Sequence, residues 1–477
     1  MVTFILSFVA LIVGYVLYGG YIQRTFNIDE KRPCPCQTHA DGVDFVPMKT
    51  WKAMLIQLLN IAGLGPVFGP ILGALWGPTA FVWIVIGSIF AGAVHDYFSG
   101  MLSMRNCGAS LPKMVGMYLG NFMEKFVNVF ALILLVLVGV VFVTGPAALL
   151  AALTPPALDL KFWVLVIFAY YILATLLPIN KIIGRLYPIF GAILLIMAFG
   201  VGGGLIMTGQ PIPELTFANF HPKGLPIWPL MFITIACGAI SGFHATQSPM
   251  VARCLQNEKY GCRTFYGMMI VEGAIALVWA AAGMSFYGGS AGLTTALATM
   301  GGPAGIVRNV CISLLGGVGG TLAILGVVVL PITSGDTAFR GARLLVSDYL
   351  HMNQTPIVNR LKVSIPLFVI GFALSQLDFN FIWRYFSWAN QSTAMMMLWA
   401  AAAYLYYEKK PHWVASLPAT FMTAVSMTYI LQAPEGFGLP TSISYPVGLG
   451  LTVLVAFLWF RRVTMHEGPT DACMIEK

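Results

Sequence analysis

Residues 60–78 read NIAGLGPVFGPILGALWGP, an almost wholly apolar stretch that contains five glycines and three prolines. In a helix interior Gly costs about 1 kcal/mol and Pro about 3 kcal/mol relative to Ala. A segment inside a bilayer has no water to satisfy its freed backbone groups, so these groups must face protein, a cavity or a ligand. If the stretch lies in a membrane, it therefore predicts a helix that is interrupted at membrane depth.

The composition places the chain in a membrane. Of its 477 residues, 58% are hydrophobic and only 9% are charged, whereas soluble domains carry about 25% charged residues. The apolar runs are continuous and about 20 residues or longer, as a bilayer of about 30 Å requires. A β-barrel would instead show alternating segments of about ten residues. The sequence predicts an all-α polytopic membrane protein formed by one transmembrane domain over residues 1–477.

Apolar runs and the loops between them predict about thirteen spans. The first run has no charged leader and no small-residue cleavage site, so we expect a retained helix there. The Gly-rich stretch 288–312 is expected to be a helical loop on the outer surface. The predicted spans cover residues 2–21, 52–75, 79–103, 126–150, 162–178, 186–208, 228–248, 265–287, 313–338, 363–377, 381–406, 412–431 and 443–461.

The basic residues predict the orientation of these spans. If loop 22–51 lies in the cytoplasm, all but four of the 26 Lys and Arg residues fall on the cytoplasmic side, the exceptions being Lys161, Lys223, Arg308 and Arg384. This bias is what the positive-inside rule describes. The sequence thus predicts an inner-membrane protein with its N-terminus outside and its C-terminus in the cytoplasm. The net charge of +8 reflects this topology, and no nucleic-acid partner is expected.

Two interrupted spans suggest an internal repeat. The second span contains AGLGP (62–66) and the seventh contains GAISGFH (238–244). Because the two are offset by five spans, an odd number, the halves would enter the membrane from opposite sides, as in transporters built from inverted repeats. We expect a first repeat at 52–208 and a second at 228–406, with peripheral helices at 2–21, 412–431 and 443–461.

The opening stretch has two interpretations that apply to different parts of it. Glycines every four residues from Gly65 to Gly77 are typical of close helix packing. Packing does not explain AGLGP, where Gly and Pro coincide, and there we expect an unwound turn that faces a ligand. The residues predicted to bind substrate at this turn are Asn60, Ala62, Gly63 and Gly65.

The seventh span concentrates polar groups at membrane depth, where such groups line pathways or bundle interiors. Ser241, Gly242 and His244 are predicted to contribute to the same site. His244 could titrate near neutral pH, or it could be a neutral imidazole bonded to a nearby carbonyl. In the eleventh span, Asn390 and Gln391 lie beyond an aromatic belt and could bond the substrate.

Ionisable residues in other spans are candidates for coupling transport to a cation. His95 and Asp96 lie in the third span, and Glu272 lies in the eighth, which the repeat makes equivalent. Intramembrane carboxylates either relay protons or hold structural ion pairs. The ninth span ends with Thr333, Ser334 and Asp336 beside an expected break at Gly335; these oxygens suit H⁺ or Na⁺, or they belong to a capped helix end.

The loop CPCQTH brings Cys34, Cys36 and His39 close enough in sequence to share a zinc ion. The alternative is a polar loop with free thiols. A metal-binding membrane sensor or a membrane-embedded enzyme that uses this loop is the second candidate function. The chain contains no Walker A pattern, and no pair of residues has the spacing of a catalytic site.

Several segments resemble the carbon starvation protein A (CstA) family of transporters. They run in family order across most of the chain: DGVDFVP (41–47), IAGLGPVFGP (61–70), FAGAVHDY (90–97), IACGAISGFHA (235–245), PITSGDTAFR (331–340) and RYFSWANQ (384–391).

The resemblance implies a LeuT-like, five-plus-five inverted repeat with one extra N-terminal and two extra C-terminal helices. It implies transport of peptides or pyruvate during carbon starvation, and it would place Thr333 and Ser334 near a cation site. We therefore expect a secondary active importer of a small carboxylate nutrient, driven by H⁺ or, less favoured, Na⁺. No resident cofactor is expected beyond the coupling ion and the speculative zinc.

Overall fold

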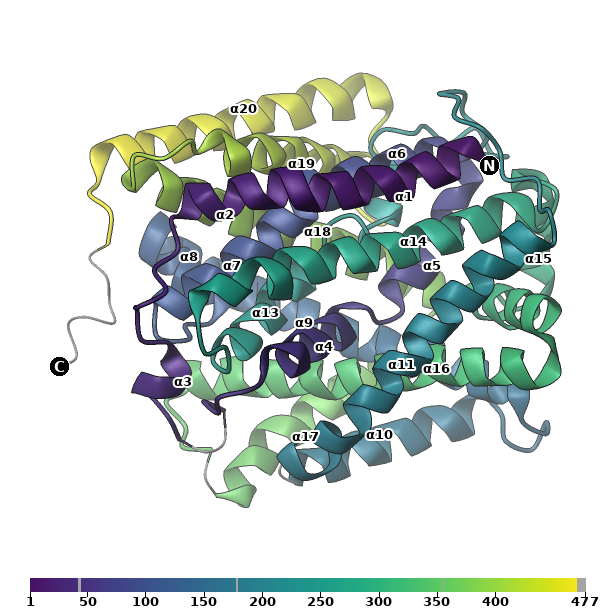
Figure 1. The fold of residues 1–477 in the computed structure, drawn as a ribbon, viewed down its shortest axis with the longest axis horizontal. Helices are drawn as coiled ribbons and strands as arrows, with labels where there is room; N and C mark the ends of the chain where they lie inside the picture. Colours follow the sequence, from purple (N-terminus) through teal and green to yellow (C-terminus); the bar gives the residue numbers. More distant parts are fainter. Residues whose placement is uncertain (42–43, 177–178, 355, 470–477) are drawn as a thin grey trace.

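The computed structural model describes residues 1–41, 44–176, 179–354 and 356–469, with the side chains of 175–188 left aside. Over these residues the chain is helical and contains no β-strand. The longest helices run roughly along the horizontal axis of Figure 1, so that the N-terminus of the first helix and the short helix α15 lie at the right end. The loop that carries α3 lies at the left end.

Helices follow one another through the described ranges, and the longest connection among them joins α11 to α12 over residues 208–229. The first part contains α1 (Val2–Gly14), η1 (Tyr15–Gly19), α2 (Gly20–Phe26), α3 (Pro35–Thr38), α4 (Thr50–Ile61), α5 (Gly65–Gly73), η2 (Ala74–Trp76), α6 (Thr79–Ile86), η3 (Gly87–Gly92), α7 (Ala93–Arg105), α8 (Leu111–Leu119), α9 (Asn121–Leu153), α10 (Leu160–Leu176) and α11 (Ile179–Met207). The second part contains α12 (Leu230–Thr234), α13 (Gly242–Ala252), η4 (Glu258–Tyr260), η5 (Cys262–Tyr266), α14 (Gly267–Ser285), α15 (Ser290–Thr299), α16 (Pro303–Tyr349), α17 (Ile357–Leu374), α18 (Phe379–Tyr407), α19 (Trp413–Gln432) and α20 (Thr441–Met465).

Nine helices within the described ranges are long and apolar enough to cross a membrane, or ten if the bent pair α4 and α5 is one span. This confirms a multi-pass helical membrane protein. The count of thirteen spans stays a prediction, as does the inverted repeat. The predicted fifth span, 162–178, starts two residues after the beginning of α10 and ends at two residues outside the described part of the chain.

The opening stretch is broken where its glycines and prolines predict. α4 ends at Ile61, α5 begins at Gly65, and the two helices are bent by 46°. Pro66 lies in the first turn of α5, where its missing N–H is tolerated. Gly77, which follows η2, has a φ of +79°, so it turns the chain rather than continuing the packing face.

α16 corrects one expectation. The predicted break at Gly335 does not exist, because the helix is regular there and its one non-helical residue is Gly316, with a φ of 71°. Gly335 instead allows a close approach: a Cβ built on it would lie 2.0 Å from the Tyr171 hydroxyl of α10. The glycine is therefore used for helix packing, which sequence alone does not separate from helix breaking.

Candidate functional site

The two broken helices lie directly against each other. A Cβ built on Gly65 would lie 2.1 Å from the Cβ of Cys237, and one built on Gly69 would lie 3.1 Å from the Thr234 carbonyl oxygen. On the other side of the turn, a Cβ on Gly63 would lie 2.6 Å from the Phe142 ring of α9. The glycines thus let α5, the end of α12 and α9 meet at one place, at the level of both breaks.

The second break is displaced from its predicted position. We expected it at 238–244, but α12 ends at Thr234 and α13 already begins at Gly242. Gly238 turns the chain with a φ of +87°, and Ser88 of η3 donates a hydrogen bond of 2.8 Å to its carbonyl. His244 therefore lies in the first turn of a helix rather than in the unwound segment.

Four predicted coupling and binding residues form one buried cluster, which we call the histidine–carboxylate cluster: His95, Asp96, His244 and Glu272. His95 Nδ1 lies 2.8 Å from Asp96 Oδ1, and His244 Nδ1 lies 2.9 Å from Asp96 Oδ2. His244 Nε2 lies 3.4 Å from Glu272 Oε2. All four side chains are 0% exposed.

Three helices supply the cluster: α7 carries His95 and Asp96, α13 carries His244, and α14 carries Glu272. Each residue looks isolated in its own apolar span, and only packing joins them. Glu272 Oε1 and His95 Nε2 have no hydrogen-bond partner among the described residues. Because buried charges need partners, these atoms are open positions at the two ends of the cluster.

The arrangement can hold and move a proton. His244 has one ring nitrogen beside Asp96 and the other beside Glu272, so an imidazole there can accept a proton on one side and release it on the other. Cys237 Sγ, His244 and Glu272 also lie within 4.8 Å of one another, close enough for a metal ion. The Cys237 sulfur, however, already contacts the Ser241 hydroxyl at 3.4 Å and the Asn390 amide at 3.3 Å.

Asn390 and Gln391 bond the protein's own chain in this structure. Asn390 Oδ1 accepts hydrogen bonds from the Phe243 amide at 2.7 Å and from the Ser241 hydroxyl at 3.1 Å, so it caps the start of α13. Gln391 Nε2 donates to the Phe232 carbonyl at 2.6 Å. Their expected contact with substrate stays a prediction, and it would require the substrate to displace these bonds.

The remaining residues predicted at the first break are buried around it. Asn60 lies in the last turn of α4 and is 4% exposed, and Ala62 follows the helix end. Ser334 of α16 donates a hydrogen bond of 3.1 Å to the Leu59 carbonyl. This bond, which the sequence did not reveal, connects the predicted cation-binding segment to the broken helix.

Each of the three oxygen-bearing side chains of that segment has a partner in the protein itself. The Thr333 hydroxyl donates to the Leu330 carbonyl at 2.8 Å, as serines and threonines do within helices. Asp336 Oδ2 lies 3.6 Å from Arg340 Nη2 and forms an ion pair along α16. A Na⁺ site at these residues stays a prediction.

The CPCQTH loop forms α3, and its three candidate ligands are separately engaged. The Cys36 thiol donates to the Leu255 carbonyl at 3.1 Å, and the exposed His39 pairs with the Thr38 hydroxyl at 2.7 Å. Burial raises the pKa of the Cys34 thiol to about 12, which opposes the thiolate that zinc needs. In the described ranges the three do not form a group of metal ligands; the zinc site stays a prediction.

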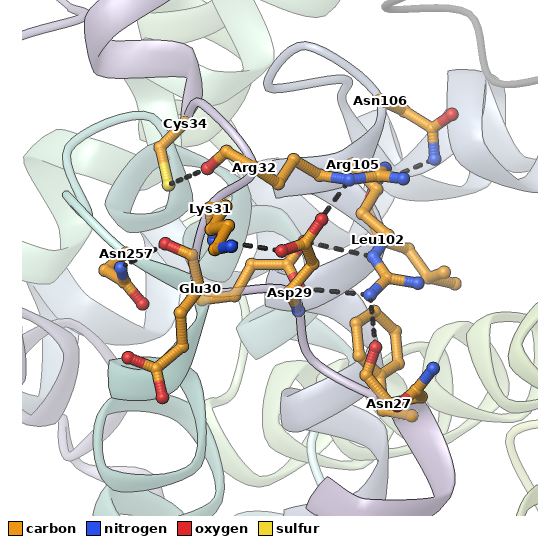
Figure 2. Close-up of polar contacts among 12 residues, drawn as sticks. Asn27, Asp29, Glu30, Lys31, Arg32, Cys34, Leu102, Arg105, Asn106 and Asn257 are labelled. Carbon is orange, nitrogen blue, oxygen red and sulfur yellow. Dashed lines mark hydrogen bonds and ion pairs between the residues drawn. The ribbon is translucent and has the colours of Figure 1, made fainter.

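Sequence reasoning missed a charged network near α3. Arg105 of α7 binds Glu258 with two nitrogen–oxygen distances of 3.0 Å and also donates to the Asn27 carbonyl at 2.9 Å, as Figure 2 shows for Asn27. Glu258 is 2% exposed and accepts a further bond from the Asp29 amide. The network fixes the segment after α2; the only signal in the sequence was a pair of charges at two span ends.

Comparisons with known proteins agree with this fold. The family model of carbon starvation protein CstA matches residues 1–157 and 149–301. A membrane protein of Haemophilus influenzae is 49% identical over 339 residues, which is 60% of this chain and 91% of that protein. The peptide transporter CstA of Escherichia coli K12 is 26% identical, covering 87% of this chain and 78% of that protein.

Two further comparisons are more distant. The pyruvate/proton symporter BtsT of Escherichia coli K12 is 26% identical, over 56% of this chain and 46% of that protein. A solved structure, the Eremococcus coleocola manganese transporter, is 15% identical with a TM-score of 0.53, over 91% of this chain and 99% of that one. That likeness is one of fold. This chain therefore belongs to the carbon starvation protein CstA family and is a membrane transporter rather than an enzyme.

Proposed function

We propose that the chain is a secondary active transporter that imports a small carboxylate nutrient, a peptide or pyruvate, in symport with H⁺. Relatives named as peptide transporters and as a pyruvate/proton symporter support the substrate class. The family name supports a role when carbon is scarce. The basic residues support an inner membrane location with the N-terminus outside.

One observation carries the coupling part of the proposal. The histidine–carboxylate cluster is fully buried and lies beside the second broken helix, since His244 is the third residue of α13. Proton relays in membranes are built from such Asp, Glu and His chains. A proton on His244 would be shared between Asp96 and Glu272, and its arrival or departure would change the charge at the start of α13.

The broken helices would receive the substrate. At the start of α5 the amides of Val67 and Phe68 already bond the Leu64 carbonyl, and at the start of α13 the His244 amide bonds the Ser241 carbonyl and the Phe243 amide bonds Asn390. The amides of Gly65 and Gly242, the first residues of the two helices, are therefore the ones that a substrate would use. Helix N-termini attract carboxylates through these amides and through the helix dipole. The contact between Gly65 and Cys237 brings the two breaks together, so one small molecule could touch both. Rocking of the helices around this point would alternate access, as in other carriers with broken helices.

Uptake into proteoliposomes tests the proposal. With an inward-directed pH gradient, wild-type protein should accumulate radiolabelled pyruvate or a dipeptide, and a Na⁺ gradient alone should not drive uptake. Glu272→Gln should abolish pH-driven accumulation while substrate binding remains measurable. Glu30→Gln is the matched control, because Glu30 is exposed and pairs only near the surface with Lys259 at 3.2 Å. Full pH-driven uptake by Glu272→Gln would contradict the proton role.

A further inference from the structure

Arg343 of α16 is a buried cation for which the described residues supply no ion-pair partner. The residue is only 8% exposed, and its Nε and Nη1 atoms have no hydrogen-bond partner among the residues that the structure describes. Buried guanidinium groups are normally paired, because an uncompensated charge at low dielectric is strongly unfavourable. A water molecule, an ion or a bound ligand can satisfy such a group where the described part of the chain does not.

The surrounding charges do not neutralise Arg343. Four charged groups act on Arg343: Arg340 and Arg360 repel it, and Asp336 and Asp44 attract it. Asp336 is already paired with Arg340 at 3.6 Å, and Asp44 is exposed. Of the two carboxylates that attract Arg343, one is therefore shared with Arg340 and the other is exposed to solvent.

The position of Arg343 relates it to the broken helices. Ser334, nine residues earlier on α16, bonds the last turn of α4, so Arg343 lies about 13.5 Å further along the same helix. A cavity of about 250 Å³ lies beside the neighbouring residues Gly341 and Leu344, but Arg343 does not line it, and its lining includes the carboxylates Asp44 and Asp348. The proposed site is therefore placed by Arg343 itself, on α16 between the contact with α4 and the end of the helix at Tyr349.

We propose that Arg343 binds an oxyanion, a carboxylate or a phosphate group, with Arg340 and Arg360 adding to the attraction. A guanidinium presents parallel N–H donors that match the two oxygens of such a group. The oxyanion could be the carboxylate of the transported substrate, which rests on the proposed function, or the phosphate of an anionic lipid or of free phosphate. The chemistry of recognition is the same in each case.

Thermal unfolding of the purified full-length chain in detergent measures the binding. The probes are pyruvate, inorganic phosphate and phosphatidylglycerol in mixed micelles, each titrated against the unfolding temperature. Wild-type protein should be stabilised by at least one probe, and Arg343→Gln should weaken its apparent affinity about tenfold or more. Arg308→Gln is the control, because Arg308 is exposed on the same helix; it should bind as the wild type does. Stabilisation by pyruvate alone would identify the substrate carboxylate, and stabilisation by phosphate or the lipid would identify a phosphate group.

The inference is overturned if no probe stabilises the wild type, or if Arg343→Gln keeps wild-type affinity for every probe that does. If Arg343→Gln does not fold, Arg343→Lys is tested instead, because lysine keeps the charge but lacks the parallel N–H donors of the guanidinium. Unchanged affinity of Arg343→Lys for the probes would again overturn the inference. The readout is independent of transport. Pyruvate binding that depends on Arg343 without any uptake would contradict the proposed function alone, and uptake with Arg343-independent binding would contradict this inference alone.

Discussion

Asp96 of α7 and His244 of α13 are joined by a contact of 2.9 Å between two fully buried side chains that are 148 residues apart in sequence. Because Asp96 also holds His95 through its other oxygen, this single carboxylate serves two imidazoles. Whatever proton the cluster carries is therefore shared across two helices, one of which begins at the second break.

Asp96→Asn should destabilise the protein and uncouple it. Removing one partner of a buried ion pair costs about 3–5 kcal/mol, because the other charge is left uncompensated. We expect a clearly lower unfolding temperature in detergent and the loss of pH-driven uptake. Asp29→Asn is the control: Asp29 is exposed, and surface changes stay within about 0.5 kcal/mol. An Asp96→Asn protein as stable as the control would argue against a charged Asp96–His244 pair.

Gly65→Ala should destabilise the protein by forcing the two breaks apart. Its Cβ would lie 2.1 Å from the Cβ of Cys237, and overpacking of this kind costs about 1–3 kcal/mol. In a Cys237→Gly background the same change should be much less harmful, since the obstructing atoms are gone. Unfolding temperatures of the two single variants and the double variant measure this coupling.

Gly203→Ala on α11 is the matched control for that experiment, because nothing lies within 4 Å of a Cβ built there. We expect it to be neutral or slightly stabilising, since Ala favours a helix over Gly. Equal losses for Gly65→Ala with and without Cys237 would show that the two breaks do not touch.

Cys34 should react slowly with iodoacetamide. Burial raises its pKa to about 12, so only about one molecule in ten thousand carries the thiolate at pH 8. The alkylation rate, followed by peptide mass spectrometry, should rise about tenfold per pH unit from 7 to 10 without levelling off. A plateau near pH 8.5 would contradict the raised pKa. Labelling that starts only after a chelator is added would instead support the zinc site with Cys36 and His39.

The predicted orientation can be tested by labelling introduced cysteines in intact cells. Lys223→Cys should react with a membrane-impermeant maleimide, because Lys223 is exposed and falls on the predicted outer side. Lys113→Cys, equally exposed, should react only after the cells are permeabilised. The reverse pattern would overturn the orientation while leaving the fold unchanged.

Much of the fold could be predicted from the sequence, because a backbone inside lipid must satisfy its hydrogen bonds within the protein. The break at 62–64 followed from Gly63, Gly65 and Pro66, whose costs in a helix are intrinsic to the residues. The same intrinsic cost of glycine led to the wrong prediction of a helix break at Gly335. Its helix is regular, and the glycine makes room for Tyr171 of another helix, which local propensity does not reveal.

The members of the candidate site could be predicted one by one, but their contacts could not. Glu272, His244 and Asp96 each stood out as ionisable groups in apolar surroundings, but nothing in the sequence joined them, since the contacts depend on how three helices pack. Asn390 was predicted to bind substrate, and that stays a prediction; in the structure it is buried and its side-chain oxygen accepts a hydrogen bond from the amide of Phe243. Polarity in a span predicts that a group is bonded, and packing decides to what.

Two consecutive residues of α18 hold the opposite halves of one broken helix. Gln391 bonds the Phe232 carbonyl of α12, and Asn390 bonds the Phe243 amide of α13. α18 thus connects the two half-helices, α12 and α13, across the break between them. If α13 moves while α12 stays in place, one of these two hydrogen bonds must break, or the 29-residue helix α18 must move together with α13. The rigidity of α18, more than the flexibility of the segment between α12 and α13, would then set how far and how fast the half-helices can separate.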